Sequence, residues 1–387
     1  MNAVAVVSNT AFSQVDSVID EVIERQEIVG AVVLISQHGR IVHQRAAGWL
    51  DRDAQRPMRS DAIFRLSSLT KPMVSATALA LVERGLIDLD DTLERRLPEF
   101  KVRTENGEPA SITLRQLLTH TAGFDYSFLQ SEDGAYQRAG VSDGIAEPGL
   151  AMDEQLKRLA GVPLSYAPGT AWRYSVALDV LGEVLARAGG ASLPELVRRY
   201  VTEPLGMQDT GFTVRDIQRL AVPYADGMPA QPMTDPQVVP FVEGLAGIRF
   251  SPSRVFDSHS FPSGGAGMVG TAPDFMHFLQ TVTNGGGAIL TTESTRSMMH
   301  NQIGDLRIDV EPTPSWGFGF GGAVLLDQAL AGGPQANGTW KWGGVYGHHW
   351  FVDPSKELVV TVLTNTGIAG MMGNFATALQ EAIYAAL

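Results

Sequence analysis

Apolar and polar positions along the chain begin with helical spacing and then change to short apolar runs. Behind an S-x-x-D start at Ser13, apolar residues recur every three or four positions as far as Ile23, which predicts an amphipathic helix. Residues 30–36 and 41–48 are short apolar segments separated by turn residues at 37–40. This spacing predicts a hairpin of antiparallel strands.

Helical periodicity dominates the middle of the chain. Gly85 and the pair Gly189-Gly190 are typical of helix ends, and Ser192 with Glu195 forms a capping-box pattern. The predicted helices cover about 70–84, 113–119, 152–160, 177–188 and 193–202.

Beyond residue 245 the pattern changes to glycine-rich turns and alternating apolar positions. Strands at both ends of the chain with helices between them predict an α+β fold, in which a central antiparallel sheet is flanked by helices. Residues 1–75 and 245–387 would form the sheet domain, and 76–244 a mostly helical inserted domain, with the active site in the cleft between them. The predicted late elements are strands at 316–325, 339–346, 349–353 and 358–364, and a final helix at about 373–386.

Composition excludes several classes of protein and partner. The 387 residues are 44% hydrophobic and 18% charged, which is typical of a globular protein and not of a disordered or collagen-like one. Forty-two acidic and 29 basic residues give a net charge of −13, which argues against nucleic acid and anionic lipid as partners. With no cysteine, the chain has no thiolate nucleophile, disulfide or cysteine zinc site.

The N-terminus and the hydropathy of the chain bear on its location. The first residues, MNAVAVVSNTAF, have no basic leader, and their apolar run is too short for the core of a signal peptide. No later stretch approaches the roughly 20 apolar residues of a transmembrane helix. We therefore expect a cytoplasmic protein that does not bind membranes.

Two short motifs compete for the role of nucleophilic serine. Residues 68–71 read S-x-x-K, and Ser142 is the serine of a G-x-S-x-G sequence. A nucleophile elbow needs a buried strand before its serine and a helix after it, whereas Ser142 follows a polar stretch and Pro148 blocks an immediate helix. We interpret Ser142 as a structural loop residue.

Ser68 lies in a better context for catalysis. Pro72 lacks the N–H that would bond to the carbonyl four residues earlier, so a helix should begin near Ser68 and place its Oγ and backbone N–H at the helix N-terminus. Lys71 follows on the same helix face, where its amine can reach the hydroxyl. On this motif alone, a capping serine and a solvated lysine remain the simpler interpretation.

Further segments change that balance. FRLSSLTKPM, LLTHTAGF, PGTAWRYSVALDVLG, EPLGMQDTGF, PSGGAGMVG and WGGVYGHHWFVD occur in consistent order between residues 64 and 353. Together they strongly resemble the serine β-lactamase and penicillin-recognising superfamily, and most closely the family VIII carboxylesterases. The resemblance implies a β-lactamase-like fold and an acyl-enzyme formed on Ser68.

The same resemblance implies the other site residues. The family's Tyr-x-Asn element looks like Tyr174-Ser175-Val176, so Tyr174 would activate Ser68 together with Lys71. Which of the two is the general base stays open. The family's third element, Lys/His-Thr/Ser-Gly, appears as Trp342 followed by two glycines. The implied roles are an oxyanion hole from the backbone N–H groups of Ser68 and Val345, and substrate contacts from Trp342, Gly343, Gly344 and Tyr126.

Departures from the family pattern bear on the substrate. Trp342 replaces a donor for a β-lactam carboxylate, and Val176 replaces a polar contact for its acylamino chain, so a neutral ester suits the site better. Lys341 is no substitute, because adjacent strand residues point to opposite faces. Trp172 and Trp350 either line the pocket or belong to the core, and Asp179 either supports the site or makes an ordinary helix hydrogen bond.

We expect neither a metal nor a cofactor. His120 is interpreted as structural, and the adjacent residues His348 and His349 would face opposite sides of a strand, which is poor metal geometry. The predicted function is a serine carboxylesterase for small-molecule esters with short acyl chains. The alternatives are a β-lactamase or D,D-peptidase, an acyltransferase that uses the same acyl-enzyme, and a catalytically silent binding module.

Overall fold

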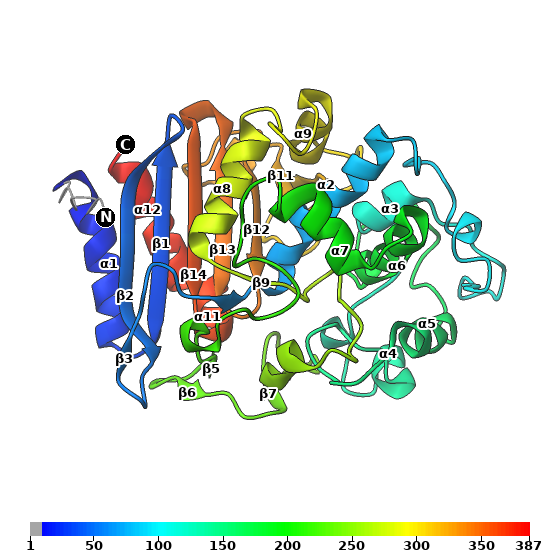
Figure 1. The fold of residues 1–387 in the computed structure, drawn as a ribbon, viewed down its shortest axis with the longest axis horizontal. Helices are drawn as coiled ribbons and strands as arrows, with labels where there is room; N and C mark the ends of the chain where they lie inside the picture. Colours follow the sequence, from blue (N-terminus) through cyan, green and yellow to red (C-terminus); the bar gives the residue numbers. More distant parts are fainter. Residues whose placement is uncertain (1–9) are drawn as a thin grey trace.

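The protein is built around one antiparallel sheet in which both ends of the chain take part (Figure 1). The computed structural model describes residues 10–387, so the prediction about the N-terminal leader lies largely outside the described residues. The eight strands have the order β10-β11-β12-β13-β14-β1-β2-β3. They comprise β1 (Gly30–Gln37), β2 (Arg40–Asp51), β3 (Arg56–Pro57), β10 (Trp316–Phe318), β11 (Ala323–Leu325), β12 (Trp340–Gly344), β13 (His348–Asp353) and β14 (Leu358–Thr364).

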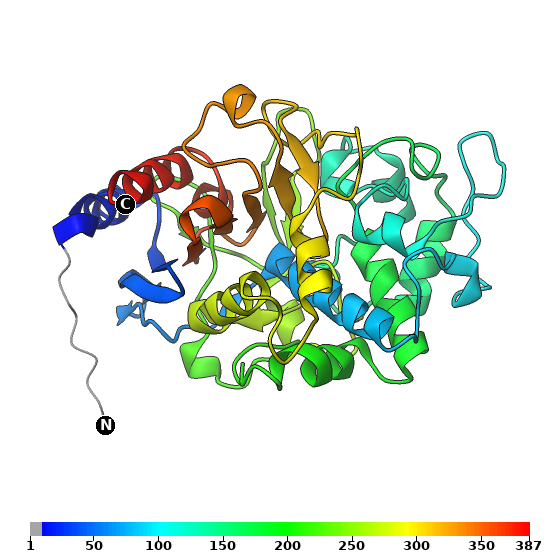
Figure 2. The ribbon, with the colours of Figure 1, turned by 90° about the horizontal axis from the view of Figure 1, so that it is seen from above.

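Helices cover both faces of the sheet. α1 (Ser13–Glu24) and α12 (Asn374–Ala385) lie side by side on one face, and α8 (Ala272–Thr283) lies on the other (Figure 2). Strand β1 is buried on both sides because its alternate residues enter two different cores. Val33 and Ile35 pack toward α1 and α12, whereas Val32 and Leu34 belong to the larger core.

Helix α2 (Thr70–Glu83) connects the sheet with the helical part of the molecule. Residues 70–81 of α2 are all buried, which identifies it as a core helix rather than an amphipathic surface helix. The neighbouring helices are α3 (Leu114–Leu118), α4 (Ala135–Ala139), α5 (Met152–Ala160), α6 (Ala177–Gly189) and α7 (Leu193–Val197), the last continued by a π-helical turn (Arg198–Thr202).

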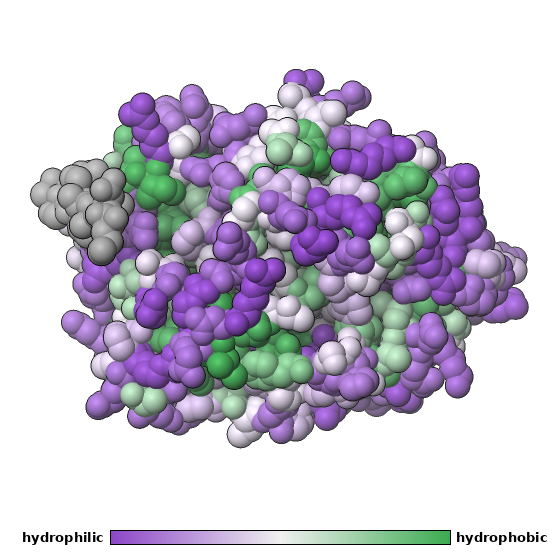
Figure 3. All heavy atoms as spheres, viewed as in Figure 1, coloured by the Kyte–Doolittle hydropathy of each residue, from purple (hydrophilic) through white to green (hydrophobic). Residues whose placement is uncertain are grey.

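Smaller elements complete the chain around this core. Three two-stranded sheets pair β4 (Phe64–Arg65) with β9 (Val269–Gly270), β5 (Tyr224–Ala225) with β6 (Gln231–Pro232), and β7 (Gln237–Val239) with β8 (Ile248–Phe250). The remaining helices are α9 (Thr292–Met299), α10 (Gln328–Ala331) and α11 (Gly367–Met371). Seen from the side of Figure 1, most of the surface is hydrophilic, and hydrophobic groups form separate patches (Figure 3).

The predicted helices and the first hairpin agree with the structure, but three details differ. The segment 316–325 is a hairpin of β10 and β11, not one strand, because Gly321 adopts the left-handed φ of +92°. Helices α8 and α9 occupy a region where only strands and turns were predicted. Ser13 lies inside α1 and does not cap it, since the capping position is Phe12. The division into two domains stays a prediction.

Candidate active site

Ser68 lies in a tight turn that leads directly into α2. The turn is a short 3₁₀ helix (Ser67–Leu69), and Ser67 has a φ of +44°, in a region that residues with side chains seldom adopt. The Leu66 amide donates to the carbonyl of Met268 at 2.9 Å, and the Tyr346 amide donates to Ser67 Oγ at 3.5 Å. These two distant residues, Met268 and Tyr346, therefore hold the turn that carries Ser68 in position.

The structure brings together the three polar groups that were predicted to cooperate. Lys71 Nζ donates a hydrogen bond to Ser68 Oγ at 3.0 Å, and Tyr174 Oη donates to the same oxygen at 2.6 Å. Lys71 is fully buried, whereas Ser68 and Tyr174 each keep 7% of their surface exposed. A small part of the serine and of the tyrosine thus remains exposed, whereas no part of the lysine does.

A loop before α8 fixes the amine of Lys71. Lys71 Nζ donates to the carbonyl of Gly265 at 2.9 Å. The amide of Gly265 in turn donates to Asp179 Oδ1 at 3.0 Å, and Ser263 Oγ donates to the same carboxylate oxygen at 2.6 Å. Asp179 thus supports the site through Gly265, and the alternative of an ordinary hydrogen bond within its own helix is wrong.

Aromatic rings pack around the amine of Lys71 and the ring of Tyr174. The ammonium of Lys71 lies 4.5 Å from the centre of the Tyr174 ring and 5.4 Å from that of Tyr126. Burial, and after it the phenol of Tyr174, raises the pKa of Tyr126 well above its ordinary value, so Tyr126 stays neutral. On the other side, Trp342 packs on Tyr174 at 5.0 Å between ring centres, and its Nε1 donates to Tyr174 Oη at 3.1 Å.

The end of β12 packs against the turn that carries Ser68. A Cβ on Gly344 would lie 2.6 Å from Ser67 Oγ, so only glycine fits there. A Cβ on Gly343 would lie 2.6 Å from Met371 Cγ, on the opposite side of the strand. Both glycines therefore accommodate neighbouring protein atoms, and their contact with substrate stays a prediction, as does the role of the Val345 N–H.

The two faces of β12 separate Trp342 from Lys341 as predicted. Trp342 points toward Tyr174, whereas Lys341 pairs with Glu311 and lies over the ring of Trp316 at 4.0 Å. The cation of Lys341 therefore has a partner outside the catalytic group.

His120 lies behind Tyr174 and has no catalytic geometry. Its ring centre is 4.9 Å from that of Tyr174, and its Nδ1 pairs with Ser175 Oγ at 3.1 Å. Burial, and secondarily the positive charge of Lys71, holds the pKa of His120 well below its ordinary value, so the imidazole is neutral. His348 and His349 bond to different backbone carbonyls, those of Arg65 and Gly370.

The other sequence candidates take structural positions. Ser142 is buried in a loop, where its Oγ accepts a hydrogen bond from the amide of Gly144 at 3.2 Å. Trp350 is a core residue that packs on Trp340 at 4.5 Å. Trp172 is also buried and stacks near Tyr174, at 6.4 Å between ring centres.

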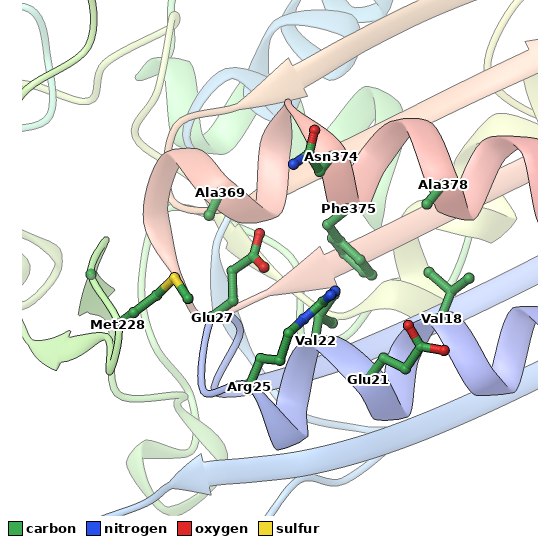
Figure 4. Close-up of a pocket in the computed structure, with 11 residues that line it drawn as sticks. Val18, Glu21, Val22, Arg25, Glu27, Met228, Ala369, Asn374, Phe375 and Ala378 are labelled. Carbon is green, nitrogen blue, oxygen red and sulfur yellow. The ribbon is translucent and has the colours of Figure 1, made fainter.

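A separate groove lies between α1 and α12, on the face of the sheet opposite to α8 (Figure 4). Its volume is about 720 Å³, and apolar residues such as Val22 and Phe375 line it together with Glu21 and Arg25. None of the residues that surround Ser68 lines this groove. Within residues 10–387, no group of three or more histidine or acidic side chains has the arrangement of a metal site, and no helix could span a membrane.

Comparisons with known proteins agree with this arrangement. A family model described as Beta-lactamase matches residues 15–383. Esterase EstB from Burkholderia gladioli is 46% identical over 376 residues, which cover 96% of this chain and 95% of that protein. The solved structure described as EstCE1, a hydrolase with promiscuous acyltransferase activity, has a TM-score of 0.93 and 40% identity and covers 97% of this chain and 99% of its own.

A more distant structure shares the fold alone. Unliganded simvastatin synthase (LovD) from Aspergillus terreus, in its selenomethionyl form, has a TM-score of 0.74 at 23% identity and covers 98% of this chain and 99% of its own. The predicted fold class is thereby confirmed.

Proposed function

The chain belongs to the beta-lactamase family, and from that premise we propose that it is a serine carboxylesterase whose nucleophile is Ser68. The observation that carries the assignment is the contact of Ser68 Oγ with Lys71 Nζ at 3.0 Å and with Tyr174 Oη at 2.6 Å. An alcohol is a weak nucleophile until a neighbouring base removes its proton, and both candidates lie within hydrogen-bond reach.

In the proposed mechanism, Ser68 Oγ attacks the ester carbonyl and gives its proton to the Lys71–Tyr174 pair. The carbonyl oxygen becomes an oxyanion, which the backbone N–H groups of Ser68 and Val345 stabilise. Tyr174 then donates a proton to the alkoxide as the ester C–O bond breaks, which releases the alcohol and leaves the acyl group on Ser68. Water then attacks the acyl carbon while Tyr174 takes its proton, the bond to Ser68 Oγ breaks, and Tyr174 returns the proton to Oγ as the acid leaves.

The surroundings of the serine favour a neutral, short-chain ester. Trp342 stands on the strand edge beside Tyr174, and the nearest cation on that strand, Lys341, is engaged by Glu311. A carboxylate of a β-lactam would thus find no free cation at this edge, while an ester needs none. These features support the finer assignment to the family VIII type of carboxylesterase.

Acyl transfer is a second candidate activity. EstCE1, at 40% identity, is described as a hydrolase with promiscuous acyltransferase activity. In this chain, Ser68 is 7% exposed and bonds to Tyr174, on whose ring Tyr126 and Trp342 pack. This environment favours apolar alcohols over water as acceptors. We propose that added alcohol competes with water for the acyl-enzyme. The cytoplasmic location stays a prediction.

A substrate panel with two serine variants tests the function. Wild-type protein should hydrolyse short-chain p-nitrophenyl esters with a kcat/KM far above that for a chromogenic cephalosporin. Ser68→Ala should abolish ester hydrolysis, and Ser142→Ala should keep it. A higher kcat/KM for the cephalosporin, or an active Ser68→Ala variant, would refute the assignment.

A further inference from the structure

The indole of Trp342 makes a polar contact that its place in the sequence motif does not suggest. Trp342 Nε1 lies 3.1 Å from Tyr174 Oη and donates to it, although the two residues are 168 positions apart. We propose that Trp342 is a positioning residue that acts on the reaction through the phenol oxygen of Tyr174. This inference rests on the proposed function.

The aromatic packing around the indole fixes the direction of its N–H. The indole of Trp342 packs against the ring of Tyr174 at 5.0 Å and against that of Phe318 at 5.2 Å between ring centres, the latter edge to face. Trp342 itself is only partly buried and lies in the middle of β12, a strand that packs against the Ser67–Leu69 turn. The packed rings therefore fix the orientation of the indole, so that its N–H points at Tyr174 Oη.

Counting donors and acceptors shows what the contact does. A phenol oxygen carries one proton and can accept hydrogen bonds in its remaining directions. Tyr174 Oη donates its proton to Ser68 Oγ and accepts from Trp342 Nε1. The indole thus occupies an acceptor direction of the phenol oxygen and leaves its O–H direction for the proton that moves between Tyr174 and Ser68.

The contact strengthens at the moment when the reaction needs it. Tyr174 Oη gains negative charge each time it gives its proton to the leaving alcohol, and a hydrogen bond to a charged oxygen is stronger than one to a neutral oxygen. An indole N–H cannot itself take up or lose a proton near neutral pH. It therefore stabilises the charged phenol without placing a second cation beside Lys71, which suits a site for neutral esters.

A second tryptophan on the same strand provides a matched control. Trp340 lies two residues earlier in β12, is fully buried, and its indole N–H has no hydrogen-bond partner among the described residues. Phenylalanine at either position removes an indole N–H and keeps an aromatic ring. Only the change at Trp342 removes a donor from Tyr174.

The experiment compares Trp342→Phe and Trp340→Phe in the full-length protein with a p-nitrophenyl ester. For Trp342→Phe, kcat should fall about 10- to 100-fold with KM changed much less, and the rising limb of the pH profile should move upward by about one to two pH units. Trp340→Phe should keep the wild-type pH profile. Trp342→Lys, which restores an N–H donor, should bring the rising limb back below that of Trp342→Phe.

Three results would overturn the inference. They are a Trp342→Phe variant with an unshifted pH profile, a loss confined to KM, or an identical shift in Trp340→Phe. A change in KM alone would assign Trp342 to substrate packing only. Failure of the proposed function has a different appearance: either the wild-type protein would prefer the cephalosporin or Ser68→Ala would remain active, whatever the behaviour of Trp342.

Discussion

Removing the carboxylate of Asp179 should disturb both the fold and the amine of Lys71. Burial raises the pKa of Asp179 above its ordinary value, and the hydrogen bonds from Ser263 and Gly265 oppose that shift. Asp179→Ala would leave those two buried donors without an acceptor. Each unpaired buried group costs about 1–3 kcal/mol, so the free energy of unfolding should fall by about 3 kcal/mol.

That loss can be converted into a melting temperature and separated from catalysis. With an unfolding entropy of about 0.8 kcal/mol/K for 387 residues, 3 kcal/mol lowers Tm by about 4 °C. The carbonyl of Gly265 would also lose its fixed position against Lys71 Nζ, and kcat should fall by about tenfold, as for the loss of one hydrogen bond to a charged group. Asp179→Asn keeps one acceptor oxygen, so its Tm should stay within about 1–2 °C of wild type.

Asp274 supplies a matched control for this prediction. It is a carboxylate on α8 that accepts from Thr210 Oγ1 at 2.9 Å and from the amide of Asp209 at 3.2 Å, with no contact to the catalytic group. Asp274→Ala should lower Tm by a similar amount and leave kcat unchanged. Scanning calorimetry measures Tm, and ester hydrolysis at a temperature below Tm measures kcat. An Asp179→Ala variant with wild-type Tm and kcat would refute the reasoning.

Three further predictions concern pH, packing and the second serine motif. Burial raises the pKa of Asp143 to about 7, so wild-type stability from this group is lost as pH rises from about 4 to about 7. In urea denaturation, the free energy of unfolding of Asp143→Asn should therefore rise relative to that of wild type as pH increases across that range. A difference in unfolding free energy that does not change with pH would contradict this. Gly344→Ala should lower kcat/KM more than Gly343→Ala, because its Cβ would meet Ser67 and the Leu66 carbonyl beside the nucleophile, whereas that of Gly343→Ala would meet the side chain of Met371. Equal losses of kcat/KM would be inconsistent with this packing. Ser142→Ala should keep kcat within about twofold, and an inactive variant would assign Ser142 a role in the reaction.

Local patterns along the chain were enough to predict the helices and the core strands. Helix α2 follows from its apolar run and from Pro72 near its start, and the hairpin of β1 and β2 from two apolar runs around a short turn. The predicted fold class is confirmed because the resemblance rests on several segments in consistent order. Helices α8 and α9 were missed because glycines and polar residues around them masked a helical period that tertiary packing stabilises.

Contacts between distant residues could not be predicted in the same way. The PSGGAGMVG segment was noted as part of the resemblance, yet nothing in it indicates that the carbonyl of Gly265 accepts from Lys71, 194 positions earlier. The sequence motif indicates only a substrate contact for Trp342 and the loss of a carboxylate donor, because a sequence does not show where an indole N–H points. The fold decides such pairings, since they depend on the register of β12 against the turn that carries Ser68.

Covalent labelling tests the central claim most directly. The full-length protein would be treated with a fluorophosphonate, which reacts with activated serines, and the modified peptide would be identified by mass spectrometry. We predict a single modification on Ser68, and little labelling in Lys71→Ala and Tyr174→Phe variants that remain folded. Modification of Ser142 instead, or undiminished labelling of Ser68 in both variants, would contradict the account.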